Sequence, residues 1–456
     1  MKRSKPFKVL VIPILALLSF SAVAQDQDTV QISLDKAVQL SMENSKQLKI
    51  AQSKILEAEA RLVQSRHQQL PQVGLSGAYL RVNSPDINLH FNPAASSSGE
   101  GGGESSSSVP EVSQAMYGTV NLTQPIFTGL KIKNSIEAAG YLKRASELNA
   151  ESQKDEVLLN TIAAYYNYYK LSATRQLVEQ SLEQARQRVT IFTNLEKNGV
   201  ITRNDLLKAQ LQESNLELTA LDVDNNLAVA NFELDILLGL PEETQLEIDT
   251  LQFQNRPEQL QALAYYLEEA PANRPDLEAS QNLEKAAESR IKVTQGDYYP
   301  SLALTGGYID AYIPNLVTVT NAVNVGVGVQ YNLSGIFTTH QKVQEARAQQ
   351  QQQTLQTELQ LDEVKKEIFR DYAAFQKSLK KIETLKVASE QAKENYRITQ
   401  NNYNNNLALI TDLLDAEVAQ LQAQVNALQA QADAQLSYYQ LEKAAGLLNT
   451  DFSNQN

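Results

Sequence analysis

The polar residues with the most telling spacing in this chain lie at a turn followed by a helix start. In the stretch GVITRNDLLKAQ, residues 199 to 210, Gly199 can adopt a positive φ at little cost. Thr202 and Asp205, three positions apart, have the form of a helix N-terminal capping pair. The chemistry that this spacing indicates is hydrogen bonding at a tight turn.

The same pattern occurs a second time, 207 residues later. In NLALITDLLDAE, residues 406 to 417, Asp412 repeats Asp205, and Asp415 adds a second carboxylate one turn further on. Carboxylates are favourable in the first turn of any helix, where they interact with the helix dipole. A solvated helix face is therefore the simplest interpretation of the pair.

No combination of residues indicates catalysis. The three histidines, His67, His90 and His340, are far apart in the sequence, and the chain has no cysteine. A catalytic or metal centre needs several such groups together. We therefore expect no catalytic residue, no bound metal and no cofactor, and an enzyme is the least expected class.

The N-terminal residues 1–24 have the form of a secretory signal. A basic head precedes an apolar run from Val9 to Phe20, and Ala22-Val23-Ala24 is a small-residue cleavage site. Removal of the four basic residues of the head would change the formal charge from −13 to −17, which argues against nucleic acid as a partner. After residue 24 the sequence has no run of eighteen apolar residues.

The chain contains two copies of one unit. At an offset of 229, Asn44, Pro71, Gly77 and Tyr79 recur as Asn273, Pro300, Gly306 and Tyr308, and at an offset of 207 Asp155-Glu156-Val157 recurs as Asp362-Glu363-Val364. The expected organisation is a signal (1–24), a first repeat (31–240), a linker (241–261), a second repeat (262–448) and a C-terminal tail (449–456).

Each repeat has the same order of patterns. Helical periodicity over 34–70 and 262–299 changes to an alternation with a period of two, as in the run from Val323 to Leu333. Each repeat therefore carries two strands, and the Ser/Gly-rich segment 92–114 is a loop between the first two. Long helical tracts over 130–197 and 338–403 follow, each about 100 Å in length. The tract 203–238 predicts a shorter helix. The length of this helix and that of the helix before the first strand together equal the length of one long helix, so we expect the two short helices to cover its two halves. The turn at 199 is then expected at the far tip of a rod.

Four strands per chain cannot close a barrel, and unpaired strand edges are not tolerated in lipid. Three chains would supply twelve strands, an even number within the range of outer-membrane barrels. Aromatic residues at the strand ends would then form girdles at the two membrane interfaces. Those near one end are Tyr79, Tyr117, Tyr308 and Tyr312, and those near the other are Phe127, Tyr298, Tyr299 and Tyr331.

The duplication, the strand pair between helices in each copy, and the pattern G-x-x-T-x-x-D-L-L-x-A of residues 199–209 resemble the TolC family of outer membrane efflux proteins. The resemblance implies a mainly α protein whose antiparallel coiled-coil helices form a periplasmic α-barrel tunnel, with four strands per chain completing a 12-stranded outer-membrane β-barrel in a homotrimer. It also implies a Gram-negative outer membrane protein that serves as the exit duct of a tripartite efflux or type I secretion system. Its partners would be a periplasmic adaptor and an inner-membrane pump.

The resemblance also implies roles for the tip residues. Asp412 and Asp415 match aspartates that constrict the tunnel and attract cations, and Asp205 and Tyr403 match a pair that restrains the closed state. The arginine that the family places five residues after that tyrosine is Ala408 here. Arg203 or Lys197 are the basic residues that would have to replace it.

Two other classes stay open from the sequence. A periplasmic adaptor has a helical hairpin, but in one copy flanked by Gly-rich β domains. A cell-surface structural coiled-coil protein would make use of the Ser/Gly-rich loop. Neither requires strand pairs before each of two long helices, and the sequence does not specify a cargo.

Overall fold

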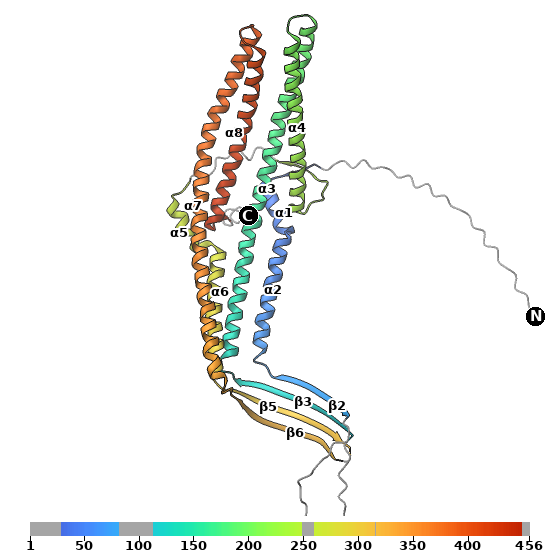
Figure 1. Ribbon diagram of the computed structural model, residues 1–456, viewed down its shortest axis with the longest axis vertical. Helices are drawn as coiled ribbons and strands as arrows, with labels where there is room; N and C mark the ends of the chain where they lie inside the picture. Colours follow the sequence, from blue (N-terminus) through green and yellow to red (C-terminus); the bar gives the residue numbers. More distant parts are fainter. Residues whose placement is uncertain (1–28, 82–112, 249–259, 315, 449–456) are drawn as a thin grey trace, which may run out of the picture.

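The computed structural model describes residues 29–81, 113–248, 260–314 and 316–448. Two long helices, α3 (Lys131–Lys197) and α7 (Gly335–Asn404), run the length of a rod (Figure 1). At 1.5 Å per residue each is about 100 Å long. The predicted signal (1–24), most of the Ser/Gly-rich loop (92–114) and the predicted tail (449–456) lie outside the described residues.

Shorter helices share the length of each long helix between them. The helices α2 (Lys46–His67) and α6 (Pro275–Gln295) cover the halves next to the strands. The helices α4 (Arg203–Leu238) and α8 (Ile410–Ala445) return from the tips along the other halves (Figure 1). The predicted pairing of two short helices with each long one is therefore confirmed.

The predicted helical tracts 34–70 and 262–299 are each divided in two. Helix α1 (Leu34–Asn44) ends at Ser45, whose side chain accepts a hydrogen bond from the backbone of Leu48 and so caps α2. In the second repeat α5 (Leu263–Asn273) ends before Pro275, which occupies the first turn of α6. Proline has no N–H and favours an extended residue before it, so a new helix starts there.

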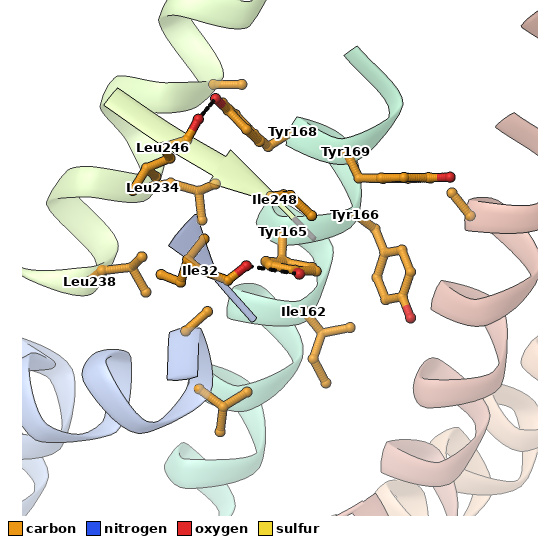
Figure 2. Packing of buried hydrophobic residues seen from close by; sticks show 14 of the residues in the cluster. Ile32, Ile162, Tyr165, Tyr166, Tyr168, Tyr169, Leu234, Leu238, Leu246 and Ile248 are labelled. Carbon is orange, nitrogen blue, oxygen red and sulfur yellow. Dashed lines mark hydrogen bonds between the residues drawn. The ribbon is translucent and has the colours of Figure 1, made fainter. Parts of the chain in front are cut away.

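A small parallel sheet near the middle of the rod was not predicted. Strand β1 (Thr29–Ile32) pairs with β4 (Gln245–Ile248), which falls within the expected linker 241–261. The hydroxyl of Tyr165 donates to the carbonyl of Ile32 at 3.2 Å, and the hydroxyl of Tyr168 donates to the carbonyl of Leu246 (Figure 2). The tyrosines of α3 thus anchor this sheet to the largest hydrophobic core.

The four remaining strands form one antiparallel sheet at the end of the rod opposite the tips (Figure 1). The strands β2 (Gln72–Arg81), β3 (Gln114–Phe127), β5 (Ser301–Ile313) and β6 (Val317–Gln330) lie in that spatial order. Two strands per repeat were predicted, and this is confirmed. Among the described residues, neither the outer edge of β2 nor that of β6 has a strand beside it.

Candidate functional sites at the tips and on the sheet

The first tip is a reciprocal helix cap, as its sequence predicts. The backbone N–H of Asp205 donates to Thr202 Oγ1 at 3.2 Å, and Asp205 Oδ2 accepts from the Thr202 backbone at 3.3 Å and from its hydroxyl at 2.7 Å. Gly199 adopts a φ of 72°, which closes the turn before the cap. The carboxylate of Asp205 therefore stabilises the start of α4.

The second tip is capped from one side only. Asp412 Oδ2 accepts from the backbone of Leu409 at 3.0 Å, but Leu409 stands where the first tip has Thr202 and has no oxygen to accept in return. Asp412 and Asp415 are both exposed, whereas Leu413 between them is buried. The two carboxylates thus lie on one solvent-facing side of α8, separated by about one turn.

The two tips of one chain pack against each other through a small hydrophobic core. Phe192, Leu206, Ile410 and Leu413 belong to it, and the ring of Tyr403 lies 6.0 Å from that of Phe192. Burial raises the pKa of the Tyr403 hydroxyl, and the nearby charge of Asp205 adds to this effect. Tyr403 is therefore part of the packing that joins the tips.

Tyr403 and Asp205 lie near each other, but no hydrogen bond joins their side chains among the described residues. The carboxylate of Asp205 is occupied by Thr202, with Lys208 at 3.9 Å. Arg203, one of the two basic residues considered in place of the missing arginine, lies 3.9 Å from Glu196 of its own hairpin. Within one chain, the described partners of the Asp205 carboxylate are therefore residues of its own hairpin.

A buried ion pair that was not predicted lies just below the tips. The two terminal guanidinium nitrogens of Arg188 on α3 donate to the carboxylate of Glu417 on α8, Nη2 at 3.1 Å. The side chains are only 11% and 6% exposed. Because bidentate pairs are strong and directional, this pair fixes the second hairpin against the first.

Further ion pairs follow the same contact between α3 and α8 toward the middle of the rod. Lys170 of α3 lies 3.0 Å from Asp433, which also forms an ion pair with Lys381 of α7 at 3.6 Å. Further from the tips the acidic residue is on α3 and the basic residue on α8, where Glu156 lies 3.1 Å from Lys443. The boundary between the two hairpins of one chain is therefore held by charges, in addition to the hydrophobic core at the tips.

The register of the sheet separates an apolar face from a polar face. Leu75, Val120, Tyr308 and Val323 lie in one row across all four strands on the apolar face. On the other face Ser76 and Thr119 are joined by a hydrogen bond of 2.6 Å between their hydroxyls. The predicted alternation between an apolar and a polar side is therefore confirmed.

The register also places the predicted aromatic residues. Tyr79 and Tyr312 flank Met116 in one row of the apolar face, and Tyr308 lies on this face four residues before Tyr312. Tyr117 is opposite Ala78 and Ala311, on the polar face, because neighbouring residues of a strand point to opposite sides. The grouping of Tyr117 with the other three is therefore not supported.

At the other end of the sheet, next to the helices, two more of the predicted aromatic residues, Phe127 and Tyr331, lie close to the row that contains Leu302. Phe127 is opposite Leu302 after an irregularity in the pairing of β3 with β5, and Leu302 is opposite Val329 of β6. Tyr331 follows directly after β6 and its hydroxyl donates to the carbonyl of Tyr298 at 3.4 Å. Aromatic side chains therefore stand at both ends of the apolar face.

A sequence model of the outer membrane efflux proteins matches residues 37–240 and 266–447, which include both repeats. The chain belongs to the outer membrane efflux protein family. Among curated relatives, the outer membrane efflux protein BepC of Brucella suis is 22% identical over 338 residues, 73% of this chain and 72% of BepC. The cation efflux system protein CusC of Escherichia coli is 25% identical over 209 residues, 42% of this chain and 44% of CusC.

Solved structures share the fold of this efflux channel over nearly its whole length. CusC superposes with a TM-score of 0.75 at 19% identity, covering 92% of this chain and 93% of CusC. The Campylobacter jejuni channel CmeC superposes with a TM-score of 0.74 at 19% identity, covering 100% of this chain and 96% of CmeC. The predicted mainly helical architecture with a strand portion is therefore confirmed.

Family membership decides the class and the location of the protein. The chain is an outer membrane efflux channel of a Gram-negative bacterium that extends into the periplasm, and it is not an enzyme. Channels of this family form trimers and act with adaptor and pump proteins.

In the part of the chain that the structure describes, no group of three His, Cys, Asp or Glu side chains is arranged to hold a metal ion. None of the described helices has the length and hydrophobicity of a membrane span.

Proposed function

We propose that three copies of this chain form one continuous duct from the periplasm to the outside, closed at the tips by the second hairpins. The observation that carries the proposal is the open four-stranded sheet, apolar on one face, attached to two hairpins that meet at their tips. A sheet with two free edges is stable in lipid only when the edges pair. Three copies pair every edge and make a barrel of twelve antiparallel strands.

The height of the apolar face supports a barrel of membrane thickness. The row of Tyr312 and the row of Leu302 are ten residues apart along β5. At about 3.3 Å per residue and a strand tilt of about 40°, this separation corresponds to roughly 25 Å along the barrel axis, the usual height of the apolar band. In this proposal Tyr79, Tyr308 and Tyr312 form the outer girdle, and Phe127 and Tyr331 form the inner one. Tyr117 faces the lumen.

The exposed carboxylates of the second tip support a cation-attracting constriction. Three copies of Asp412 and Asp415 around a threefold axis would bring six carboxylates together where the α8 helices converge. Such a ring attracts cations and opposes anions at the mouth of a pore. The restraint between Tyr403 and Asp205 is proposed to act between neighbouring chains, since within one chain no hydrogen bond joins them.

A periplasmic adaptor and an inner-membrane pump of the RND, ABC or MFS type are the proposed partners. Among the relatives, BepC is named an efflux protein and CusC a cation efflux system protein. A further relative, from Aggregatibacter actinomycetemcomitans, is named a toxin and drug export protein. Both tripartite efflux and type I secretion are therefore compatible with the duct, and the pump determines the cargo.

The decisive experiment is purification of the mature protein from outer membranes in detergent, followed by light scattering and planar bilayer recording. We expect a trimeric mass and discrete conductance steps. Wild-type protein and a variant with Asp412 and Asp415 replaced by Ala should both form trimers, which separates assembly from pore chemistry. A monomer that is stable without detergent would overturn the proposal.

A further inference from the structure

The polar face of the four-stranded sheet is polar over only part of its length. In the half next to the helices, its rows contain amides, hydroxyls and glycines. One such row consists of Gly74, Asn121, Gly307 and Asn324. In the half far from the helices the rows are apolar. The row of Tyr117 consists of Ala78, Tyr117, Ala311 and Val319. This far half of the sheet is therefore largely apolar on both faces.

The apolar region extends to the rows on both sides of Tyr117. Further from the helices, Leu80 lies opposite Ala115 and Ile313 lies opposite Val317. Nearer to the helices, Ile309 is the large apolar side chain of its row. We call this region the collar, and its large side chains are Leu80, Tyr117, Ile309, Ile313, Val317 and Val319. Several of them are exposed. A contiguous exposed apolar surface is typical of a place where another molecule binds.

The collar carries no charge. The charged residues of the four described strands are Arg81 and Asp310. Both lie on the other face of the sheet, because Arg81 is two residues after Tyr79 and Asp310 lies opposite Gly118, the neighbour of Tyr117. An ionic molecule therefore finds no counter-charge at the collar, whereas an apolar group finds a surface that it can remove from water.

Hydrogen-bonding groups lie directly beside the collar. Ser76 and Thr119, whose hydroxyls are 2.6 Å apart, belong to the same row as Ile309. The next row toward the helices contains the amides of Asn121 and Asn324. A molecule with an apolar part and a hydrogen-bonding part can therefore place the first on the collar and the second on these rows, so that no polar group is left unsatisfied.

We propose that the collar binds the apolar part of uncharged amphiphilic small molecules as they leave the channel. The proposal rests on the trimeric channel proposed above, in which the polar face lines the lumen and three copies repeat each row around it. A barrel of twelve strands is wider than the barrels of about eight strands that side chains fill, so a passage remains beside the collar. The helices extend into the periplasm, so the collar lies toward the extracellular end of the sheet (Figure 1).

The collar can be tested by fluorescence, because the natural chain contains no tryptophan and Tyr117→Trp places a single reporter there. The probe is 4-nitrophenyl glucoside, an uncharged amphiphile whose nitrophenyl group quenches tryptophan, and glucose is the matched molecule without the apolar group. In purified channels the quenching should saturate with probe concentration, and glucose should have no effect. The control reporter is Asn121→Trp, four residues nearer to the helices on the same face, where quenching should rise linearly as in random collisions.

Two changes of the collar in the Tyr117→Trp background test its chemistry. Ile309→Asn with Val319→Asn makes the collar polar and should raise the half-saturating probe concentration at least tenfold, because apolar contact area is lost. Ile309→Leu with Val319→Leu keeps the collar apolar and should change this concentration by less than about threefold. If the polar variant does not assemble, the comparison of the two reporter positions decides.

Light scattering and planar bilayer recording of the same proteins separate binding from assembly. A conducting trimer with saturable quenching only at position 117 supports the collar. A conducting trimer with linear quenching at both positions, the result expected if other protein covers the collar, overturns the proposal and leaves the channel standing. Saturation that persists in the polar variant overturns it as well. A monomer in detergent overturns the trimeric channel itself.

Discussion

The pair of Arg188 and Glu417 should hold the channel closed from within each chain. Both side chains are nearly buried and join α3 to α8 just below the tips. Replacing Glu417 by Gln keeps the size of the side chain but leaves the Arg188 charge buried without a counter-charge. Removal of one partner of a buried ion pair costs about 3–5 kcal/mol. Gln still accepts one hydrogen bond, so we expect a loss near the lower end, about 3 kcal/mol.

This loss of free energy destabilises only the states in which the two hairpins are in contact, because the ion pair is already broken in states in which they are apart. Each 1.36 kcal/mol changes an equilibrium constant tenfold, so about 3 kcal/mol should raise the ratio of open to closed channels roughly 150-fold. Single-channel recording at fixed voltage and salt measures this ratio as the open probability. The ion selectivity of the open channel should not change, because Glu417 is buried and faces α3.

A matched control comes from the same helix. Arg175 lies 2.6 Å from Asp224, but both side chains are about half exposed and the pair joins α3 to α4 within one hairpin. Exposed pairs contribute about 0–1 kcal/mol, so Asp224→Asn should change the open probability by less than about fivefold. If Glu417→Gln opens the channel no more than Asp224→Asn, the buried pair does not restrain the tips.

Three further predictions concern the tips and the middle of the rod. Replacing Asp412 and Asp415 together by Ala should lower cation selectivity and weaken block by multivalent cations in planar bilayers, and an unchanged block would rule out the carboxylate ring. Tyr403→Phe should raise resting conductance a few-fold at unchanged selectivity, because a hydroxyl contact between chains is lost while the ring still packs on Phe192. Burial raises the pKa of Asp155 to about 6, and its Oδ1 has no hydrogen-bond partner among the described residues. The folded chain then binds the proton more tightly than the unfolded chain, so this group's contribution to stability should fall as pH rises from about 4 to above 6. Asp155→Asn should raise the melting temperature at pH 7.5 relative to the natural protein and leave it nearly unchanged at pH 4, and equal shifts at both pH values would contradict this assignment.

Local sequence patterns were sufficient for the elements and for the duplication. The helix from Arg203 to Leu238 was predicted with both ends, because the capping pair at Thr202 and the glycine at 239 act on residues close in the chain. The alternation in β6 was equally clear, since a strand with one apolar face repeats every two residues.

Where the local signal was weak, the prediction was wrong or incomplete. The break at Ser45 depends on one hydroxyl that caps the next helix, and a serine inside a helical pattern does not by itself indicate a break. Strand β4 is only four residues long and is recognisable only through its partner β1, more than two hundred residues earlier. Such a pairing has no periodicity that a single segment could display.

Two features of the function were decided by the tertiary structure alone. The strand alternation predicts that some aromatics share a face, but only the pairing of β3 with β2 and β5 places Tyr117 on the polar side, because a shift of one residue exchanges the faces. Arg188 and Glu417 are separated by 229 residues and become partners only when the two hairpins lie side by side. Sequence periodicity reports which side of an element is apolar, whereas the partner of each side chain depends on how whole elements pack. The channel class was therefore predictable from the sequence of this protein, whereas the contacts between its two hairpins were not.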